Sequence, residues 1–133
     1  MGEGNAAAKP LVLIVEDDPI LSLDLAEVLE ELDYTVCGVA GNAAAAIKLA
    51  AQHKPELALV DVGLNGDMDG IDLAVRLRRD FAVPSIIVTG ALCSDLAERA
   101  QPAQPAGFLS KPYTPWELEK ALSEARHCFE AAR

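Results

Sequence analysis

Five short runs of apolar residues recur along the chain, and each has the length of a β-strand. Several of them are continuously apolar rather than alternating, which is typical of strands covered on both faces. A sheet made of such strands is expected to be parallel, with helices on each side. The predicted strands are Leu11–Val15, Tyr34–Ala40, Leu57–Val60, Ser85–Val88 and Ala106–Leu109.

The first two intervening segments have helical spacing. Asp18 and Pro19 mark a helix start, because an aspartate caps free backbone N–H groups and a proline fits the first helical turn. Asn42 is expected to cap an alanine-rich helix over residues 43–51. In the first helix, apolar residues recur at helical intervals and predict one buried stripe: Leu21, Leu25, Val28, Leu29 and Leu32.

The three later helices differ in length. A helix is predicted over Ile71–Arg79, after an Asp-Gly pair, and a short one over residues 94–101, which the prolines of QPAQP prevent from continuing. The last helix begins at Pro115, where Thr114 and Glu117 form a T-x-x-E capping box. Its predicted buried stripe is Leu118, Ala121, Leu122, Ala125 and Phe129.

Strands that alternate with helices through short connections predict an α/β fold, a doubly wound five-stranded parallel sheet with helices on both faces. With 133 residues and no linker or internal repeat, the chain is expected to form one domain over residues 10–130. Residues 1–9 are expected to be a flexible N-terminal arm. In such sheets ligands bind beyond the carboxyl ends of the strands.

The charge balance disfavours nucleic acid as a partner. The chain has 21 acidic and 11 basic residues, for a net charge of −10, and it lacks the excess of Lys and Arg that phosphate backbones require. The arginines at 76, 78 and 79 are interpreted as a solvated helix face.

The cysteines and the N-terminus favour a reducing, cytoplasmic location. Cys37, Cys93 and Cys128 are odd in number and widely spaced, so neither a disulfide framework nor a zinc site is indicated. The N-terminus lacks the basic and apolar pattern of a secretory signal, and no segment reaches the ~18 apolar residues that span a membrane.

Polar side chains follow four of the five apolar runs. The first run is followed by Glu16, Asp17 and Asp18, the third by Asp61, the fourth by Thr89 and the fifth by Ser110 and Lys111. Because parallel strands end at one edge of a sheet, the carboxylates of Asp17 and Asp61 are expected to lie close together. At about 4 Å they would repel by ~4 kcal/mol for an effective dielectric constant of about 20.

Such a cluster requires a cation, and Mg²⁺ fits because it takes one or two carboxylates and completes its shell with water and phosphate oxygens. Lys111 and Thr89 would supply an ammonium and a hydroxyl donor. Asp61 is the best candidate nucleophile, since it directly follows a buried strand and precedes the glycine-containing loop VGLNGDMDG.

The motifs LVLIVEDDP, LALVDVGLNGDMDG, SIIVTG and FLSKP, in this order, resemble the receiver domain of two-component response regulators over about residues 10–127. The resemblance implies the flavodoxin-like strand order 2-1-3-4-5. It also implies that Asp61 is the phosphoacceptor, that Asp17 and the Gly63 backbone carbonyl bind Mg²⁺ directly, and that Glu16 acts through water. Thr89 and Lys111 would contact the phosphoryl group, Thr89 and Phe108 would form the switch, and the bond before Pro112 is expected to be cis.

The chain departs from the commonest receiver pattern in four places. The acidic pair is Glu-Asp, Phe108 lacks a hydroxyl, the loop LNGDMDG is one residue longer than usual, and QPAQP interrupts the fourth helix. The last change bears on the family's usual dimerisation surface, so a homodimer stays open. The loop and the VTG sequence resemble small regulators that accompany sensor kinases of the general stress and light-sensing type.

The resemblance implies a signalling module that accepts a phosphoryl group from a phosphohistidine of a sensor histidine kinase or phosphotransfer protein and catalyses only its own phosphorylation and dephosphorylation. Its output would be a changed surface for a downstream protein. Because the chain begins with Met and its last helix looks complete, a stand-alone receiver is favoured over a piece of a longer regulator.

Two other classes are disfavoured. A Mg²⁺-dependent phosphatase with an aspartyl nucleophile would need a carboxylate two residues after Asp61, where Gly63 stands. A flavin- or nucleotide-binding protein would need a phosphate loop after the first strand, where VEDDP is acidic.

Overall fold

The computed structural model describes residues 9–64, 68–90 and 93–131, with side chains as far as Arg126. Strands and helices alternate along this part of the chain as predicted, and every predicted strand end agrees to within one residue. The elements are β1 (Leu11–Val15), α1 (Pro19–Glu31), β2 (Thr35–Ala40), α2 (Ala43–His53), β3 (Leu57–Asp61), α3 (Gly70–Phe81), β4 (Ser85–Thr89), α4 (Ser94–Ala100), the 3₁₀ helix η2 (Gln101–Ala103), β5 (Gly107–Ser110) and α5 (Pro115–Ala131).

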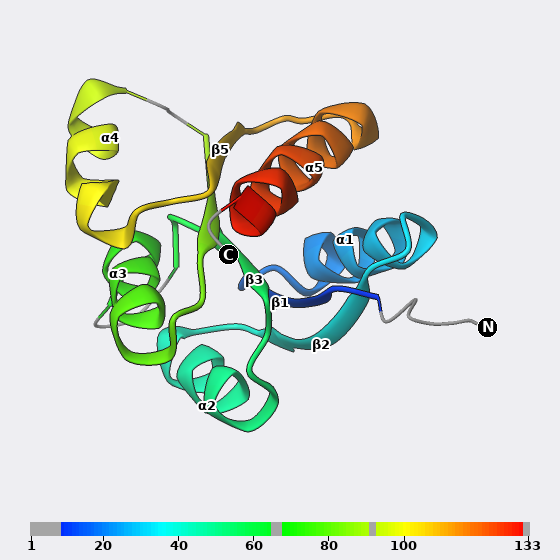
Figure 1. The fold of residues 1–133 in the computed structure, drawn as a ribbon, viewed down its shortest axis with the longest axis horizontal. Coiled ribbons are helices and arrows are strands. Elements are labelled where there is room, and N and C mark those ends of the chain that lie inside the picture. Colours follow the sequence, from blue (N-terminus) through cyan, green and yellow to red (C-terminus); the bar gives the residue numbers. More distant parts are fainter. Residues whose placement is uncertain (1–8, 65–67, 91–92, 132–133) are drawn as a thin grey trace.

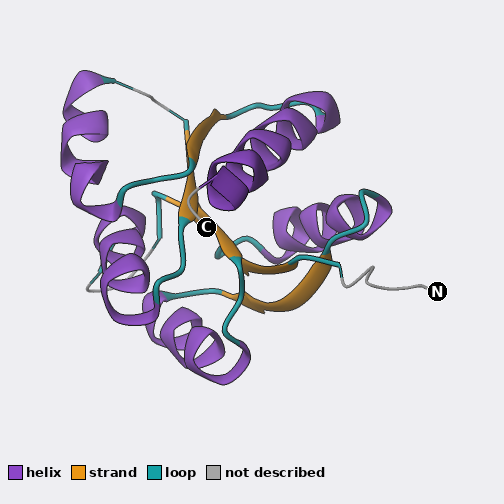
Figure 2. Ribbon diagram, in the orientation of Figure 1, coloured by secondary structure: helices purple, strands orange, loops and turns teal. Residues whose placement is uncertain are grey.

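All neighbouring strands are parallel, and the sheet order β2-β1-β3-β4-β5 confirms the predicted fold. Helices α1 and α5 cover one face of the sheet, and α2, α3 and α4 cover the other (Figure 1). Coloured by secondary structure, the strands form one central layer between two helical layers (Figure 2). The register pairs Val15 with Val60, Asp61 with Val88, and Thr89 with Ser110, so the strands end at a common edge.

Successive residues of the central strands supply the two sides of the core. On β1, Val12 and Ile14 pack with α1 and α5, whereas Leu13 and Val15 pack with α2 and α3. Both β3 and β4 are buried along their whole length, which explains why their sequences are continuously apolar.

Helix α1 differs from the predicted stripe at its first member. Leu21 is 49% exposed, while Ser22, Leu25 and Leu29 are the buried residues of this helix. The buried face is therefore rotated by about one position at the N-terminal turn, and the Ser22 hydroxyl is accommodated there because it donates to the Pro19 carbonyl oxygen. The prediction for Leu21 is wrong because it relied on hydrophobicity, and a small hydrogen-bonded residue occupies the buried position instead.

The predicted helix boundaries follow from capping. Asn42 accepts a hydrogen bond from the Ala45 N–H, and Thr114 and Glu117 form the reciprocal capping box at the start of α5. Helix α4 is short, as the prolines predicted, and continues only as the 3₁₀ turn η2.

The three arginines of α3 do not all lie on a solvated face. Arg76 and Arg79 form exposed ion pairs with Asp80, but Arg78 donates to the carbonyl oxygens of Ala103 and Gln104. Arg78 thus connects η2 to α3. The distribution of charges along the α3 sequence does not reveal this contact.

Ser85 contains a buried hydroxyl at the start of β4. The residue is 1% exposed, and its Oγ has no hydrogen-bond partner among the described residues. Because a desolvated hydroxyl without a partner is unfavourable, Ser85→Ala is expected to raise the free energy of unfolding by up to ~1 kcal/mol. Urea unfolding of both proteins measures the difference, and a clear loss of stability in the variant would show that the hydroxyl is bonded, for example to a buried water.

Some predictions concern residues outside the described set. They are the N-terminal arm over residues 1–8, residues 65–67 of the LNGDMDG loop, and the side chains of Cys128 and Phe129. Within the described part of the chain, none of the helices combines the length and apolarity that crossing a lipid bilayer requires.

Candidate phosphorylation and metal site

The candidate site lies at the carboxyl edge of the sheet, where β1 and β3 end side by side. The Glu16 N–H donates to the Ala40 carbonyl oxygen and the Val62 N–H donates to the Val88 carbonyl oxygen, so both strand ends are bonded to their outer neighbours. Glu16 and Asp61 are buried, with 9% and 8% of their surfaces exposed. The backbone therefore holds two carboxylates at a rigid edge of the sheet.

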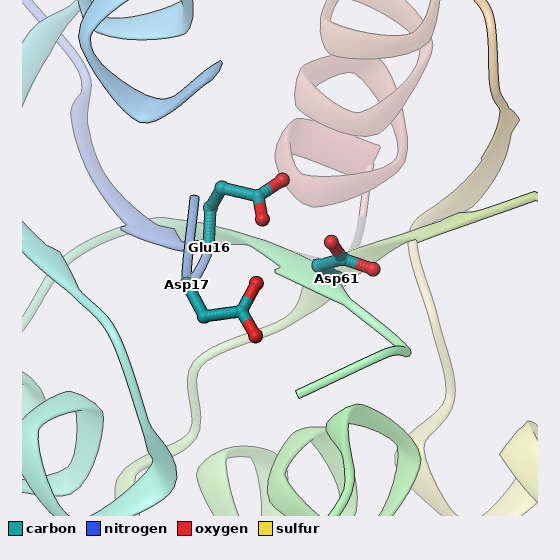
Figure 3. A group of neighbouring side chains, drawn as sticks. All are labelled: Glu16, Asp17 and Asp61. Carbon is teal, nitrogen blue, oxygen red and sulfur yellow. The ribbon is translucent and has the colours of Figure 1, made fainter. Parts of the chain in front are cut away.

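Three carboxyl groups face one another at this edge. Glu16, Asp17 and Asp61 each place an oxygen so that all three atoms lie within 4.8 Å of one another. Figure 3 shows their side chains, from the end of β1 and the end of β3, pointing into the same space. The structure thus brings Asp17 and Asp61 together as the strand ends predicted, and it places Glu16, which the resemblance implied, beside them.

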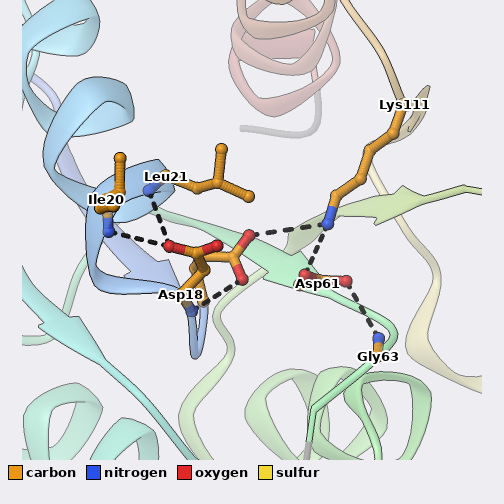
Figure 4. Close-up of polar contacts among 7 residues, drawn as sticks. Asp18, Ile20, Leu21, Asp61, Gly63 and Lys111 are labelled. Carbon is orange, nitrogen blue, oxygen red and sulfur yellow. Dashed lines mark hydrogen bonds and ion pairs between the residues drawn. The ribbon is translucent and has the colours of Figure 1, made fainter.

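Lys111 supplies the opposite charge. Its Nζ lies 2.7 Å from Asp61 Oδ2 and 3.6 Å from Glu16 Oε1. The other Asp61 oxygen, Oδ1, accepts from the Gly63 N–H at 2.9 Å, and Glu16 Oε2 accepts from the Asp18 N–H at 3.2 Å (Figure 4). The carboxylate of Asp61 is therefore oriented through both of its oxygens.

These contacts shift the pKa values of the two buried carboxyl groups in opposite directions. Burial raises the pKa of the Asp61 carboxyl, but the Lys111 hydrogen bond and charge and the Gly63 N–H outweigh it, so the pKa lies below its ordinary value. The pKa of Glu16 is raised, first by burial and then by the negative charge of Asp61. Burial lowers the pKa of Lys111, but the bond to Asp61 dominates and the pKa is raised. Asp61 is consequently an ionised carboxylate beside a protonated lysine at neutral pH.

Thr89 and Phe108 lie on the neighbouring strands. Thr89 ends β4, is 6% exposed, and its carbonyl oxygen accepts from the Lys111 N–H at 2.8 Å. Phe108 on β5 is half-buried and packs on the α3 and α4 side, against the cluster that includes Ile87 and Leu96. The Lys111–Pro112 peptide bond is cis.

An open pocket of about 460 Å³ adjoins the carboxylates between α1 and the segment after β5. Its walls include Glu16, Leu21, Lys111 and Tyr113. Sequence reasoning missed Leu21 and Tyr113 as neighbours of the site. Tyr113 could have been found, because it stands two positions after Lys111, the lysine at the end of a strand. Ile20 and Leu23, which are 77% and 63% exposed, add apolar surface to α1.

Gly70 is a third residue that sequence reasoning did not connect to the site. A Cβ atom built on Gly70 would overlap the Asp61 carbonyl oxygen and lie 2.7 Å from Val62 Cα. The first residue of α3 must therefore be glycine for the helix to approach the end of β3 this closely.

The donor set suits a hard divalent cation. Mg²⁺ prefers oxygen ligands and is held by one or two carboxylates together with water and phosphate oxygens. Glu16, Asp17 and Asp61 present such oxygens at one edge, so they could bind a metal ion.

Comparisons with known proteins agree with this geometry. Residues 12–123 match the family model of the response regulator receiver domain. The chain is 37% identical over 123 residues to the transcriptional regulatory protein PdtaR of Mycobacterium tuberculosis, covering 92% of this chain and 60% of that protein. It is 33% identical to the phyllosphere-induced regulator PhyR of Methylorubrum extorquens, covering 92% and 45%. The chain thus spans about half the length of these regulators.

A solved structure matches over almost the whole chain. The signal receiver domain of a modulated diguanylate cyclase from Desulfovibrio desulfuricans G20 superposes with a TM-score of 0.86 at 34% identity, covering 95% of this chain and all of that one. The family match over most of the chain, the shared fold and the acidic strand ends lead to one conclusion: the protein belongs to the response regulator receiver domain family of two-component systems.

Proposed function

We propose that the chain is a phosphorylation-dependent signalling receiver, in which Asp61 accepts a phosphoryl group from a phosphohistidine. The observation that supports this most directly is the ionised Asp61 carboxylate, held 2.7 Å from Lys111 within the cluster of three carboxyl groups. Members of the matched family share this receiver fold.

In the proposed reaction an oxygen of Asp61 forms a bond to phosphorus while the bond from phosphorus to the histidine nitrogen breaks. The electron pair of that bond stays on the ring nitrogen, and the imidazole leaves as a neutral base because its other ring nitrogen already carries a proton, while Asp61 becomes an acyl phosphate. Lys111 stays protonated and moves from a carboxylate oxygen to a phosphoryl oxygen, so its charge is conserved within the site. The Thr89 hydroxyl donates to another phosphoryl oxygen.

Mg²⁺ would be held by Asp17, Asp61 and the Gly63 carbonyl, with Glu16 acting through water, and would neutralise the charge of the phosphoryl oxygens. Since Glu16 already accepts from the Asp18 N–H and lies near Lys111, it is suited to orient a water rather than to bind directly. The chain's own activity would be limited to gaining and losing this phosphoryl group.

The phosphodonor is proposed to be a sensor histidine kinase or a phosphotransfer protein that docks beside α1. The pocket next to Asp61 is the open approach, and Leu21, which is 49% exposed and lines this pocket, gives the approach an apolar border. An acidic chain with an apolar border fits a protein partner better than a nucleic acid.

The experiment that tests the proposal is phosphorylation of the whole chain by acetyl phosphate with Mg²⁺, followed by mass spectrometry and peptide mapping. One phosphoryl group at Asp61, lost when Mg²⁺ is chelated during the reaction, is the expected result. Modification at another residue, or none under conditions in which a known receiver is labelled, would overturn the proposal.

Phosphorylation is expected to change the surface formed by α4 and α5 through Thr89 and Phe108. If Thr89 turns toward the phosphoryl group, it vacates space that the half-buried Phe108 ring can fill, and burying such a ring is worth ~1.5–3 kcal/mol. A gain of that size shifts a two-state equilibrium by about ten- to a hundredfold. Thr89→Ala should therefore still accept phosphate but fail to change this surface.

NMR chemical shifts on addition of Mg²⁺ and beryllofluoride, a phosphoryl mimic, measure this coupling in the wild type and in Thr89→Ala. Thr35→Ala serves as a control, because Thr35 is an exposed threonine on β2. Equal shift changes in α4 and α5 for all three proteins would rule out the role of Thr89.

A further inference from the structure

An ion pair joins α4 to the first turn of α3. Arg99 Nη2 on α4 lies 2.7 Å from Asp69 Oδ2 and 4.0 Å from Asp72 Oδ1. Asp69 uses its other oxygen, Oδ1, to accept from the Asp72 N–H at 2.9 Å, which caps α3. One carboxylate therefore fixes the start of α3 and binds α4 at the same time.

The start of α3 is in turn fixed against the backbone of the candidate phosphoacceptor. The Gly70 N–H donates to the Val62 carbonyl oxygen at 3.2 Å. There is so little space that a Cβ on Gly70 would overlap the Asp61 carbonyl oxygen. A displacement of the α3 N-terminus toward β3 would therefore push against the backbone of Asp61 and Val62, and a displacement away from β3 would break the Gly70–Val62 hydrogen bond.

Helix α4 is fastened to α3 at a second point as well. Arg78 of α3 donates to the carbonyl oxygens of Ala103 and Gln104 at 3.4 and 3.0 Å, directly after α4. Between the two arginine contacts, Leu96 and Ala100 pack in one apolar cluster with Ile71 and Ala74 of α3. Helix α4 and the start of α3 are thus expected to move together.

We propose that Arg99 is a positioning residue for the metal and phosphorylation site. Its ion pair with Asp69 holds the first turn of α3 in the position that keeps Asp61, Val62 and Gly63 ready to bind Mg²⁺. This inference rests on the proposed function. It adds a structural connection between the site and α4 that runs from β3 through Gly70 and Asp69. This connection is separate from the one through Thr89 and Phe108. Because coupling between two sites is reciprocal, Mg²⁺ binding should also change the environment of Arg99.

The test measures Mg²⁺ affinity by calorimetry for the wild type, Arg99→Gln and Arg79→Gln. Arg79 is the matched control, because it forms an exposed ion pair with Asp80 at the far end of α3. Both substitutions make the chain more acidic, which by itself strengthens cation binding. We expect Arg99→Gln to weaken Mg²⁺ binding instead, by about two- to fivefold as suits an exposed ion pair, with partial rescue in Arg99→Lys and no weakening in Arg79→Gln.

A double-mutant cycle identifies the partner. Asp69→Asn keeps an oxygen that can cap α3 but removes the charge, so Arg99→Gln should weaken Mg²⁺ binding far less in that background. The reciprocal readout is the NMR signal of the Arg99 Nε–H, which is expected to shift when Mg²⁺ is added to the wild type.

The outcomes separate this inference from the function on which it rests. Suppose that the wild type binds Mg²⁺ and that the Mg²⁺ affinity of Arg99→Gln equals that of the wild type or of Arg79→Gln. The role of Arg99 is then overturned, and the proposed function stands. Equal effects of Arg99→Gln with and without the Asp69 charge would likewise overturn it. If the wild type binds no Mg²⁺, both proposals fail.

Discussion

Replacing Asp61 with asparagine is expected to reduce phosphorylation by acetyl phosphate, or by a phosphorylated kinase, to background. Asparagine has nearly the same shape, but its amide is a poor nucleophile and lacks the charge that Lys111 contacts at 2.7 Å. The fold should persist, since β3 pairs with β1 and β4 through its backbone. Phosphate incorporation, with circular dichroism to monitor folding, measures both parts of the expectation.

Asp33→Asn is a suitable control for this experiment. Asp33 is an exposed aspartate in the turn before β2, far in sequence from the site, and makes a long ion pair with Lys9 at 3.9 Å. It should be labelled like the wild type. Full labelling of Asp61→Asn would place the phosphorylated residue elsewhere in the chain.

The second large effect is expected for Asp17→Ala, which should lose at least about tenfold more Mg²⁺ affinity than Glu16→Ala, a difference of ~1.4 kcal/mol. Asp17 is proposed as a direct ligand. The carboxylate of Glu16, in contrast, already accepts from the Asp18 N–H and lies 3.6 Å from Lys111. Calorimetric titration of Mg²⁺ into each variant gives the ranking.

Asp24→Ala provides the comparison for this pair, because Asp24 lines the pocket beside the site but is not in the group of three carboxyl residues. It should change Mg²⁺ affinity less than either substitution. If Asp17→Ala and Glu16→Ala lose the same affinity, the assignment of Asp17 as the direct ligand is wrong.

The strands could be predicted because the physical cause is local, whereas their order was implied by the motif resemblance. A strand covered on both faces needs apolar residues at nearly every position. In β3 and β4 only three residues are polar: Ser85, at the start of β4, and the terminal residues Asp61 and Thr89. The exceptions are informative in their own right, since two of the three stand at the carboxyl edge where the site lies.

The approach of Asp17 to Asp61 was also predictable, because parallel strands must end at one edge of the sheet. The motif resemblance then assigned a role to each residue, and those roles await the experiments above. In contrast, the rotation of α1 that exposes Leu21 depends on the hydrogen bond from the Ser22 hydroxyl to the Pro19 carbonyl oxygen. The spacing of apolar residues does not reveal this bond.

Contacts between helices distant in sequence were beyond sequence reasoning. The pair of Arg99 and Asp69 joins residues 30 positions apart, and the Arg78 contacts with Ala103 and Gln104 join residues 25 and 26 apart. Nothing in the local pattern distinguishes these arginines from Arg76 and Arg79, which form exposed ion pairs within α3.

The central place of β3 has a consequence for hydrogen exchange. Because β3 is buried throughout and bonded to β1 and β4, its amide hydrogens can exchange with solvent only when the middle of the sheet opens. The edge strands β2 and β5 each have one partner and can exchange through local opening. The phosphorylation proposed at Asp61 would therefore take place at the end of one of the most protected strands of the sheet, and the larger accompanying motions are expected in the loops and helices around it.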